Sequence, residues 1–235
     1  MTDIKTMCRH AAFHLPVYCV AAFILLNILA MFIYPGGTYQ EPDLNSYKFT
    51  MNYFSDLGRT MTMNGTNNFF ACFLFNLNLL MIGSLMVVFF YYLPELFKQN
   101  KTAYILCRIS SLVAITSGIA FAGVGLTPSD LYLDEHMFFV RWAFRSYLLV
   151  AVLFIPTILK APEWKNKYAA AYVFFALFLL TYNLIMDFGP DGKETMEGLI
   201  FQVVAQKIIV LAFSITIMIK SLGARHNFNN LIQSG

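Results

Sequence analysis

The sequence predicts an all-α membrane protein, a six-transmembrane-helix bundle with both termini cytoplasmic. Hydrophobic residues make up 58% of the 235 residues and charged residues only 12%. Soluble domains average about 45–50% apolar and about 25% charged residues. The apolar residues also gather in six long runs. Composition and distribution together favour a bilayer over water as the solvent of this chain.

Each run is long enough to cross the hydrocarbon core of a membrane. A core of ~30 Å requires about 20 mostly apolar residues per helix. Lipid offers no hydrogen-bond partners, so we expect each crossing to be helical. The runs are continuous and do not alternate as the strands of an outer-membrane barrel do. The predicted helices are 14–34, 69–92, 103–124, 137–159, 168–186 and 198–219, within a single domain that covers residues 1–235.

The distribution of Lys and Arg predicts the orientation. Cytoplasmic connections of membrane proteins carry an excess of both residues. If the N-terminus is cytoplasmic, that side holds ten of them and the opposite connections hold three. The long connection 35–68 then lies outside the cell, and we expect the plasma (inner) membrane of a bacterium. The inner set is Lys5, Arg9, Lys98, Lys101, Arg108, Lys160, Lys165, Lys167, Lys220 and Arg225, and the outer set is Lys48, Arg59 and Lys193.

Several classes of function are disfavoured. The net charge is +3 without a basic block, so we expect no nucleic-acid partner. The four cysteines form no C-x-x-C pair and imply neither a disulfide framework nor a metal site. We therefore expect no metal and no cofactor.

Three cations lie within the predicted crossings. A charged side chain in the bilayer interior costs several kcal/mol unless it is paired or hydrated. Arg141 and Arg145 are four residues apart and share a face of the fourth helix. Lys207 lies near the middle of the bilayer, ~18 Å along the sixth helix at 1.5 Å per residue. Each of these residues requires an explanation.

Most other polar residues at membrane depth also belong to the outer half, and the inner half shows no comparable set. This asymmetry predicts a polar cavity that opens outward between the second, fourth, fifth and sixth helices. The alternative is that the cations pair with acids such as Asp130 and Asp187 only to hold the helices in register. The polar residues are Asn76, Asn183, Asp187, Gln202 and Gln206 in the helices, and Asp56, Arg59, Asp130 and His136 near the outer turns.

Short motifs resemble a known membrane family. They are Tyr53-Phe-Ser-Asp-Leu-Gly58, Asn67-Asn68 with Phe75-Asn76, and Gly123-Val-Gly-Leu-Thr-Pro-Ser-Asp130 followed by His136. In these motifs the chain resembles the integral-membrane family catalogued as domain of unknown function 998 and, more distantly, the Frag, DRAM and Sfk groups. The resemblance covers roughly residues 10–220. It implies a six-helix fold and no particular activity, with polar positions at Ser55, Gly58, Asn76, Asp130 and His136.

The first functional hypothesis is a binding site for a lipid or amphiphile headgroup. Guanidinium groups bind phosphate and carboxylate oxygens in a two-pronged manner. Arg141, Arg145 and Lys207 would hold such a group, and the apolar helices would receive acyl chains.

An enzymatic form of this hypothesis would modify the bound lipid. His136 with Asp130 or Asp56 is then the candidate general acid or base, and Ser55 is the candidate nucleophile. The chain has no G-x-S-x-G, H-E-x-x-H or Walker motif.

Two other hypotheses stay open. A small-molecule or proton-coupled transporter would use Asp187, Lys207 and the two glutamines Gln202 and Gln206 as a relay, although the sequence shows no inverted repeat. A non-catalytic membrane factor would bind a partner within the bilayer. The sequence leaves the oligomeric state open.

Overall fold

The computed structural model describes residues 4–233 and is helical apart from its connections. Its six long helices are each apolar enough to cross a membrane, as predicted, and no strand forms within residues 4–233. The side chain of Lys5, which the charge count includes, lies outside the described part. The helices are α1 (Ile4–Ile33), α2 (Phe69–Tyr92), α3 (Lys101–Leu126), α4 (Leu133–Leu159), α5 (Asn166–Phe188) and α6 (Met196–Gln233), with short 3-10 helices η1 (Phe54–Gly58) and η2 (Leu93–Phe97).

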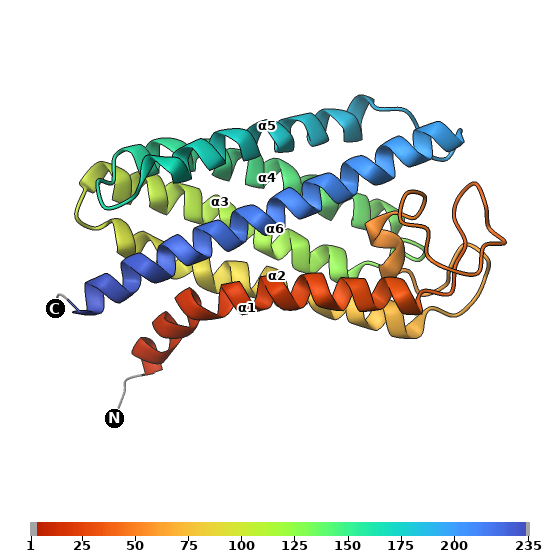
Figure 1. Ribbon diagram of the computed structural model, residues 1–235, viewed down its shortest axis with the longest axis horizontal. Helices are drawn as coiled ribbons and strands as arrows, with labels where there is room; N and C mark the ends of the chain where they lie inside the picture. The colour runs from red at the N-terminus through yellow and green to blue at the C-terminus, as the bar shows by residue number, and fades with distance from the viewer. Residues whose placement is uncertain (1–3, 234–235) are drawn as a thin grey trace.

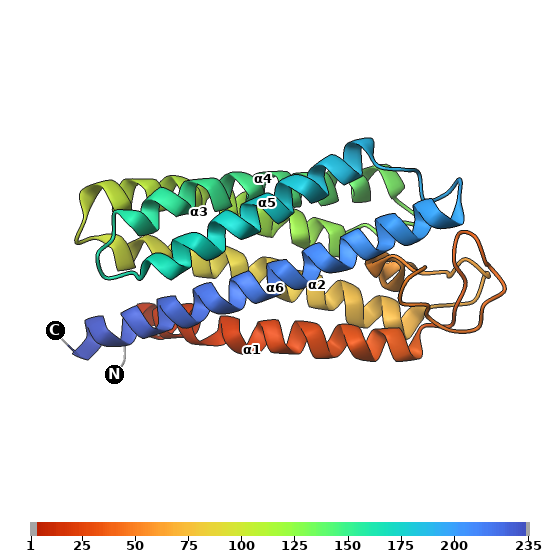
Figure 2. The same ribbon diagram turned by 45° about the horizontal axis from the view of Figure 1, so that its top comes forward.

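The helices run side by side along the long axis of the molecule (Figure 1). Each packs on the next along the chain, and α6 returns to pack on α1, which closes the bundle into a ring. Figure 2 shows both chain ends at one end of the bundle and the connection between α1 and α2 at the other. We call these the terminal end and the cap end.

Two helices extend well beyond the predicted bounds. α1 begins at Ile4 instead of residue 14, and α6 ends at Gln233 instead of residue 219. The extensions pack on each other, because the ring of Phe228 lies 4.7 Å from that of Phe13 and 5.1 Å from that of His10. The residues after 219 thus continue α6 as part of the bundle. Hydrophobic length marks the part of a helix that fits a bilayer, but it does not mark where the helix ends.

The connection between α1 and α2 is an ordered cap, residues 34–68. Its centre is Asn52, which is fully buried. The Asn52 amide donates to the Gly37 carbonyl (2.7 Å), and its oxygen accepts from the Lys48 backbone N–H (2.9 Å). Asn68 closes the far side by donating to the carbonyls of Leu57 (3.1 Å) and Arg59 (2.8 Å). The cap thus has internal hydrogen bonds that hold η1 against the bundle.

α2 and α3 approach each other through glycines. A Cβ added at Gly83 would lie 2.5 Å from the Gly118 carbonyl oxygen, and one added at Gly118 would lie 2.9 Å from the Gly83 oxygen. Small residues at helix interfaces permit this close backbone contact. The pair fixes the spacing between α2, which carries Asn76, and the α3–α4 unit.

We predict that Gly83→Ala lowers the free energy of unfolding by about 1–3 kcal/mol, because overpacking a tight contact forces backbone shifts. The measurement is thermal unfolding of the purified chain in detergent. Ser84→Ala, one residue away on the exposed face of α2, is the matched control and should change little. Equal stability of the Gly83 variant and the wild type would mean that the two helices can separate without cost.

Candidate functional site

A groove at the cap end brings together part of the predicted site. It measures about 1350 Å³ and is bounded by α3, α4, α5, the α5–α6 connection, α6 and the cap with η1. The predicted residues that line it are Ser55, Asp56, His136, Arg141, Arg145, Gln202 and Gln206.

Six predicted residues do not line the groove. Arg59 stays within the cap, where its Nε donates to the Met61 carbonyl (3.1 Å). The others hold the helices or the cap in place, as described below. They are Asn76, Asp130, Asn183, Asp187 and Lys207.

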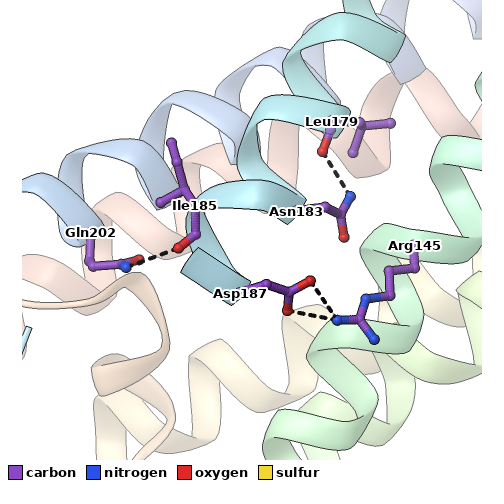
Figure 3. A network of polar contacts seen from close by, with 6 residues as sticks. All are labelled: Arg145, Leu179, Asn183, Ile185, Asp187 and Gln202. Atoms are coloured by element: carbon purple, nitrogen blue, oxygen red, sulfur yellow. Dashed lines mark hydrogen bonds and ion pairs between the residues drawn. The ribbon is translucent and has the colours of Figure 1, made fainter. Parts of the chain in front are cut away.

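Arg145 is neutralised by the protein. Figure 3 shows its guanidinium reaching from α4 to Asp187 at the end of α5, with Nη2 at 2.7 and 2.9 Å from the two carboxylate oxygens. Beside this pair, Asn183 donates to the Leu179 carbonyl (2.7 Å) within α5. Gln202 donates to the Ile185 carbonyl (3.2 Å) and so joins α6 to α5. For Arg145 the alternative explanation therefore holds: the residue pairs with an acid, Asp187, and this pair joins α4 to α5.

Arg141 has no such partner. Within residues 4–233, no hydrogen bond or ion pair to this guanidinium is present. Its side chain is exposed and lines the groove. Arg141 is therefore a cation in the groove that the described residues leave uncompensated.

Lys207 holds the cap on the bundle. It is 8% exposed, and its ammonium donates to the backbone carbonyl of Asn52 (2.5 Å). The rings of Tyr47 and Phe49 lie 5.4 and 5.0 Å from the ammonium nitrogen, within reach of a cation–π interaction. The side chain is thus turned toward the cap and away from the groove.

Gln206 adds a second link between α6 and the cap. Its side-chain oxygen accepts from the Phe54 backbone N–H at 2.6 Å, at the first residue of η1. This bond and the Lys207 bond together place Ser55, the next residue, at the groove wall. We call Lys207, Gln206 and their cap partners Asn52 and Phe54 the latch.

Asp56 lies under the cap and is 3% exposed. One of its oxygens accepts from the Tyr53 backbone N–H (2.8 Å) and from the Asn52 amide (3.2 Å). Burial raises the pKa of the Asp56 carboxyl to about 6, although these hydrogen bonds and the nearby charges of Arg59 and Lys207 act in the opposite direction.

Asp130 joins the α3–α4 connection to the cap. It accepts from the backbone N–H and hydroxyl of Thr60 (3.0 and 2.5 Å) and from the Met61 N–H (2.9 Å). Burial alone would raise the pKa of Asp130, but these hydrogen bonds outweigh it and hold the pKa below its usual value.

The other residues of the family-like motifs also support the cap. Asn76 donates to the Gly58 carbonyl (3.1 Å), and a Cβ at Gly58 would lie 2.6 Å from the Asn76 oxygen. His136 is buried, and its Nδ1 lies 2.7 Å from the Thr127 carbonyl. Within the described chain no hydrogen bond joins His136 to Asp130 or Asp56. The Ser55 hydroxyl likewise has no hydrogen-bonded base.

An apolar chamber adjoins the groove. It lies in the middle of the ring, has a volume of about 80 Å³, and is lined mainly by aromatic and aliphatic side chains of α1, α2, α3, α4 and α6. Ser55, Val140 and Gln206 line both the chamber and the groove. We call these three residues the neck.

Lys220 was missed as a buried residue. The sequence analysis placed it in a cytoplasmic connection, but it lies inside α6 at 1% exposure. Its ammonium has no hydrogen-bond partner and lies 3.5 and 4.2 Å from the ring centres of Phe154 and Phe90 and 5.2 Å from that of Tyr172. The terminal half thus holds one buried lysine that the predicted asymmetry of polar residues did not include. The sequence contains a signal for the burial of Lys220, because apolar residues such as Leu222 and Phe228 continue past residue 219.

The predicted relay for a transporter is not continuous. Asp187 binds Arg145, Lys207 binds the Asn52 carbonyl, and Gln206 binds Phe54. Each residue is committed to a different partner. The described residues contain no cluster suited to a metal ion, and the four cysteines are free.

Comparison with known proteins finds no match among family models, curated proteins or solved structures. The resemblance to the domain of unknown function 998 therefore stays a prediction.

We predict that the stability of the cap falls as the pH rises from about 4 to about 6. The folded chain binds the Asp56 proton more tightly than the unfolded chain does, because its folded pKa lies above the ordinary value, so folding is favoured at the acidic side of this range. Asp56→Asn should remove this dependence and stabilise the cap at pH 7.5 by about 2–3 kcal/mol.

Hydrogen exchange of the cap amides as a function of pH measures this effect. Asp43→Asn is the control, because Asp43 is an exposed carboxylate of the same cap. A wild-type cap that grows more stable between pH 4 and 6 would contradict the prediction.

We predict that Lys220→Met stabilises the protein by about 1–3 kcal/mol. Taking an ammonium out of water costs several kcal/mol, and aromatic rings return only about 2 kcal/mol. Lys98→Met, an exposed lysine at the same end, should stay within about 0.5 kcal/mol of the wild type in the same unfolding assay. Destabilisation by Lys220→Met would show that the ammonium has a favourable partner.

Proposed function

We propose that this protein is an integral membrane protein that binds the headgroup of a lipid or other amphiphile in the groove at its cap end. In this proposal both termini are cytoplasmic and the groove opens outward. Two features support the orientation: the excess of Lys and Arg on the side of the termini, and the position of both chain ends opposite the cap.

The observation that carries the proposal is Arg141. It lies eight residues after the first residue of α4, which is about 12 Å along the helix. A guanidinium at that depth is costly unless it is paired or hydrated, and no acidic side chain within residues 4–233 forms an ion pair with it. A phosphate or carboxylate in the groove would bind it through two charge-assisted hydrogen bonds.

The other charges of the groove limit the kind of headgroup. Its wall carries three basic residues and three acidic ones, so a headgroup with one net negative charge, or a zwitterion, suits it better than a polyanion. The basic residues are Arg141, Arg145 and Lys193, and the acidic residues are Asp56, Asp134 and Asp191.

Binding is better supported than catalysis. A nucleophile normally lies within hydrogen-bond reach of its base, and within residues 4–233 no hydrogen bond joins the Ser55 hydroxyl to a histidine or a carboxylate. The Nδ1 of His136 forms a hydrogen bond with the Thr127 carbonyl, and the Asp130 carboxylate accepts hydrogen bonds from the cap. These contacts explain the motif residues as supports of the groove wall.

We predict that Arg141→Gln weakens binding of 1-palmitoyl-lysophosphatidylglycerol by roughly 10- to 100-fold, because a hydrogen bond to a charged group contributes about 1.5–3 kcal/mol. Native mass spectrometry of the purified full chain measures the bound fraction at increasing lipid concentration. Arg108→Gln replaces an exposed arginine at the other end of the bundle and should bind as the wild type does. Equal binding by Arg141→Gln and the wild type would exclude the proposed headgroup site.

A further inference from the structure

The apolar chamber is a space between the helices of the ring that side chains leave unfilled. Its wall includes Phe23 of α1, Phe75 and Leu79 of α2, and Val210 and Phe213 of α6. Protein interiors are otherwise close-packed, and voids larger than a water molecule are few. A chamber of this size in the centre of the bundle is therefore a candidate binding site.

The wall chemistry excludes water as the favoured occupant. A buried water requires two to four polar partners. The polar side chains of the wall are Ser55, Gln206 and Ser214. Gln206 already binds the Phe54 N–H, and Ser214 donates to the Val210 carbonyl at 2.9 Å. The chamber is thus suited to hydrocarbon.

The apolar chamber and the polar groove adjoin at the neck. Ser55, Val140 and Gln206 belong to both walls. A molecule that lies across the neck therefore meets charged side chains of both signs in the groove and mainly aromatic and aliphatic groups in the chamber. This sequence of environments matches an amphiphile, with its charged head in the groove and its chain in the chamber.

We infer that the chamber receives the end of one hydrocarbon chain of the bound amphiphile, which passes the neck beside Ser55 while the head stays at Arg141. This inference rests on the proposed function and deepens it, because it specifies a single-chain site. The volume of about 80 Å³ accepts a chain end and has no room for two chains. Any second chain of the ligand must stay in the bilayer.

The experiment uses lysophosphatidylglycerol whose single acyl chain carries a diazirine near its end. The full chain is labelled by light in detergent, and the labelled peptides are mapped by mass spectrometry. In the wild type the label should fall on chamber residues of α2 and α6, including Leu79 and Phe213. Label confined to lipid-facing residues of the helices would overturn the inference.

Adjacent residues of α6 provide matched variants. Val210→Phe fills the chamber, whereas Leu211→Phe places the same ring on the exposed face. We expect Val210→Phe to reduce chamber labelling at least tenfold and Leu211→Phe to leave it within twofold. Unchanged chamber labelling in Val210→Phe would also overturn the inference. If Val210→Phe does not fold, Leu79→Phe replaces it, with the exposed Leu77→Phe of α2 as its control.

The Arg141→Gln and Val210→Phe variants together distinguish a failure of this inference from a failure of the proposed function. If the head does not bind at Arg141, Arg141→Gln leaves total labelling unchanged, and the proposed function fails. If the head binds but the chain lies elsewhere, Arg141→Gln lowers total labelling while Val210→Phe does not move the label. In that case the function stands and the chamber inference fails.

Discussion

The attachment of the cap to α6 determines the shape of the candidate site. The Lys207 ammonium and the Gln206 side chain both bind backbone groups of the cap, so they fix η1 independently of the side chains that η1 carries. Ser55 and Asp56 are consequently held at the wall of the groove. Asp130 of the α3–α4 connection likewise binds backbone groups of the cap, the N–H groups of Thr60 and Met61. These links also place Ser55 of η1 in the neck, beside Val140 of α4 and Gln206 of α6.

The sequence was sufficient for the number of crossings and insufficient for their ends. Apolar runs of about 20 residues predict crossings because water and lipid differ so strongly as solvents. The helical extensions at the terminal end depend instead on specific contacts, such as the 2.8 Å pair between Arg9 and Glu95 and the rings around Phe228. These contacts join segments far apart in the chain, and the local pattern of apolar residues does not predict them.

The position of each site residue along its helix could be predicted, but most of the partners could not. Position along a helix follows from the residue number, so Arg145 and Lys207 were correctly expected within the helices. Their partners depend on how the helices rotate and where the cap lies. Arg145 has a carboxylate partner that the sequence had offered as a candidate. Lys207 binds a backbone carbonyl, a group that every residue has, and sequence patterns do not distinguish one carbonyl from another.

The buried or groove-lining cations of the long helices have three different surroundings. Arg145 uses a carboxylate, Lys207 a carbonyl and two rings, and Lys220 three rings. Arg141 uses none of these within residues 4–233, although it lines the groove at the cap end. Arg145 and Lys207 each have a partner within the protein that binds the charged group. We therefore regard the free guanidinium as the position where this protein takes its counter-charge from outside itself.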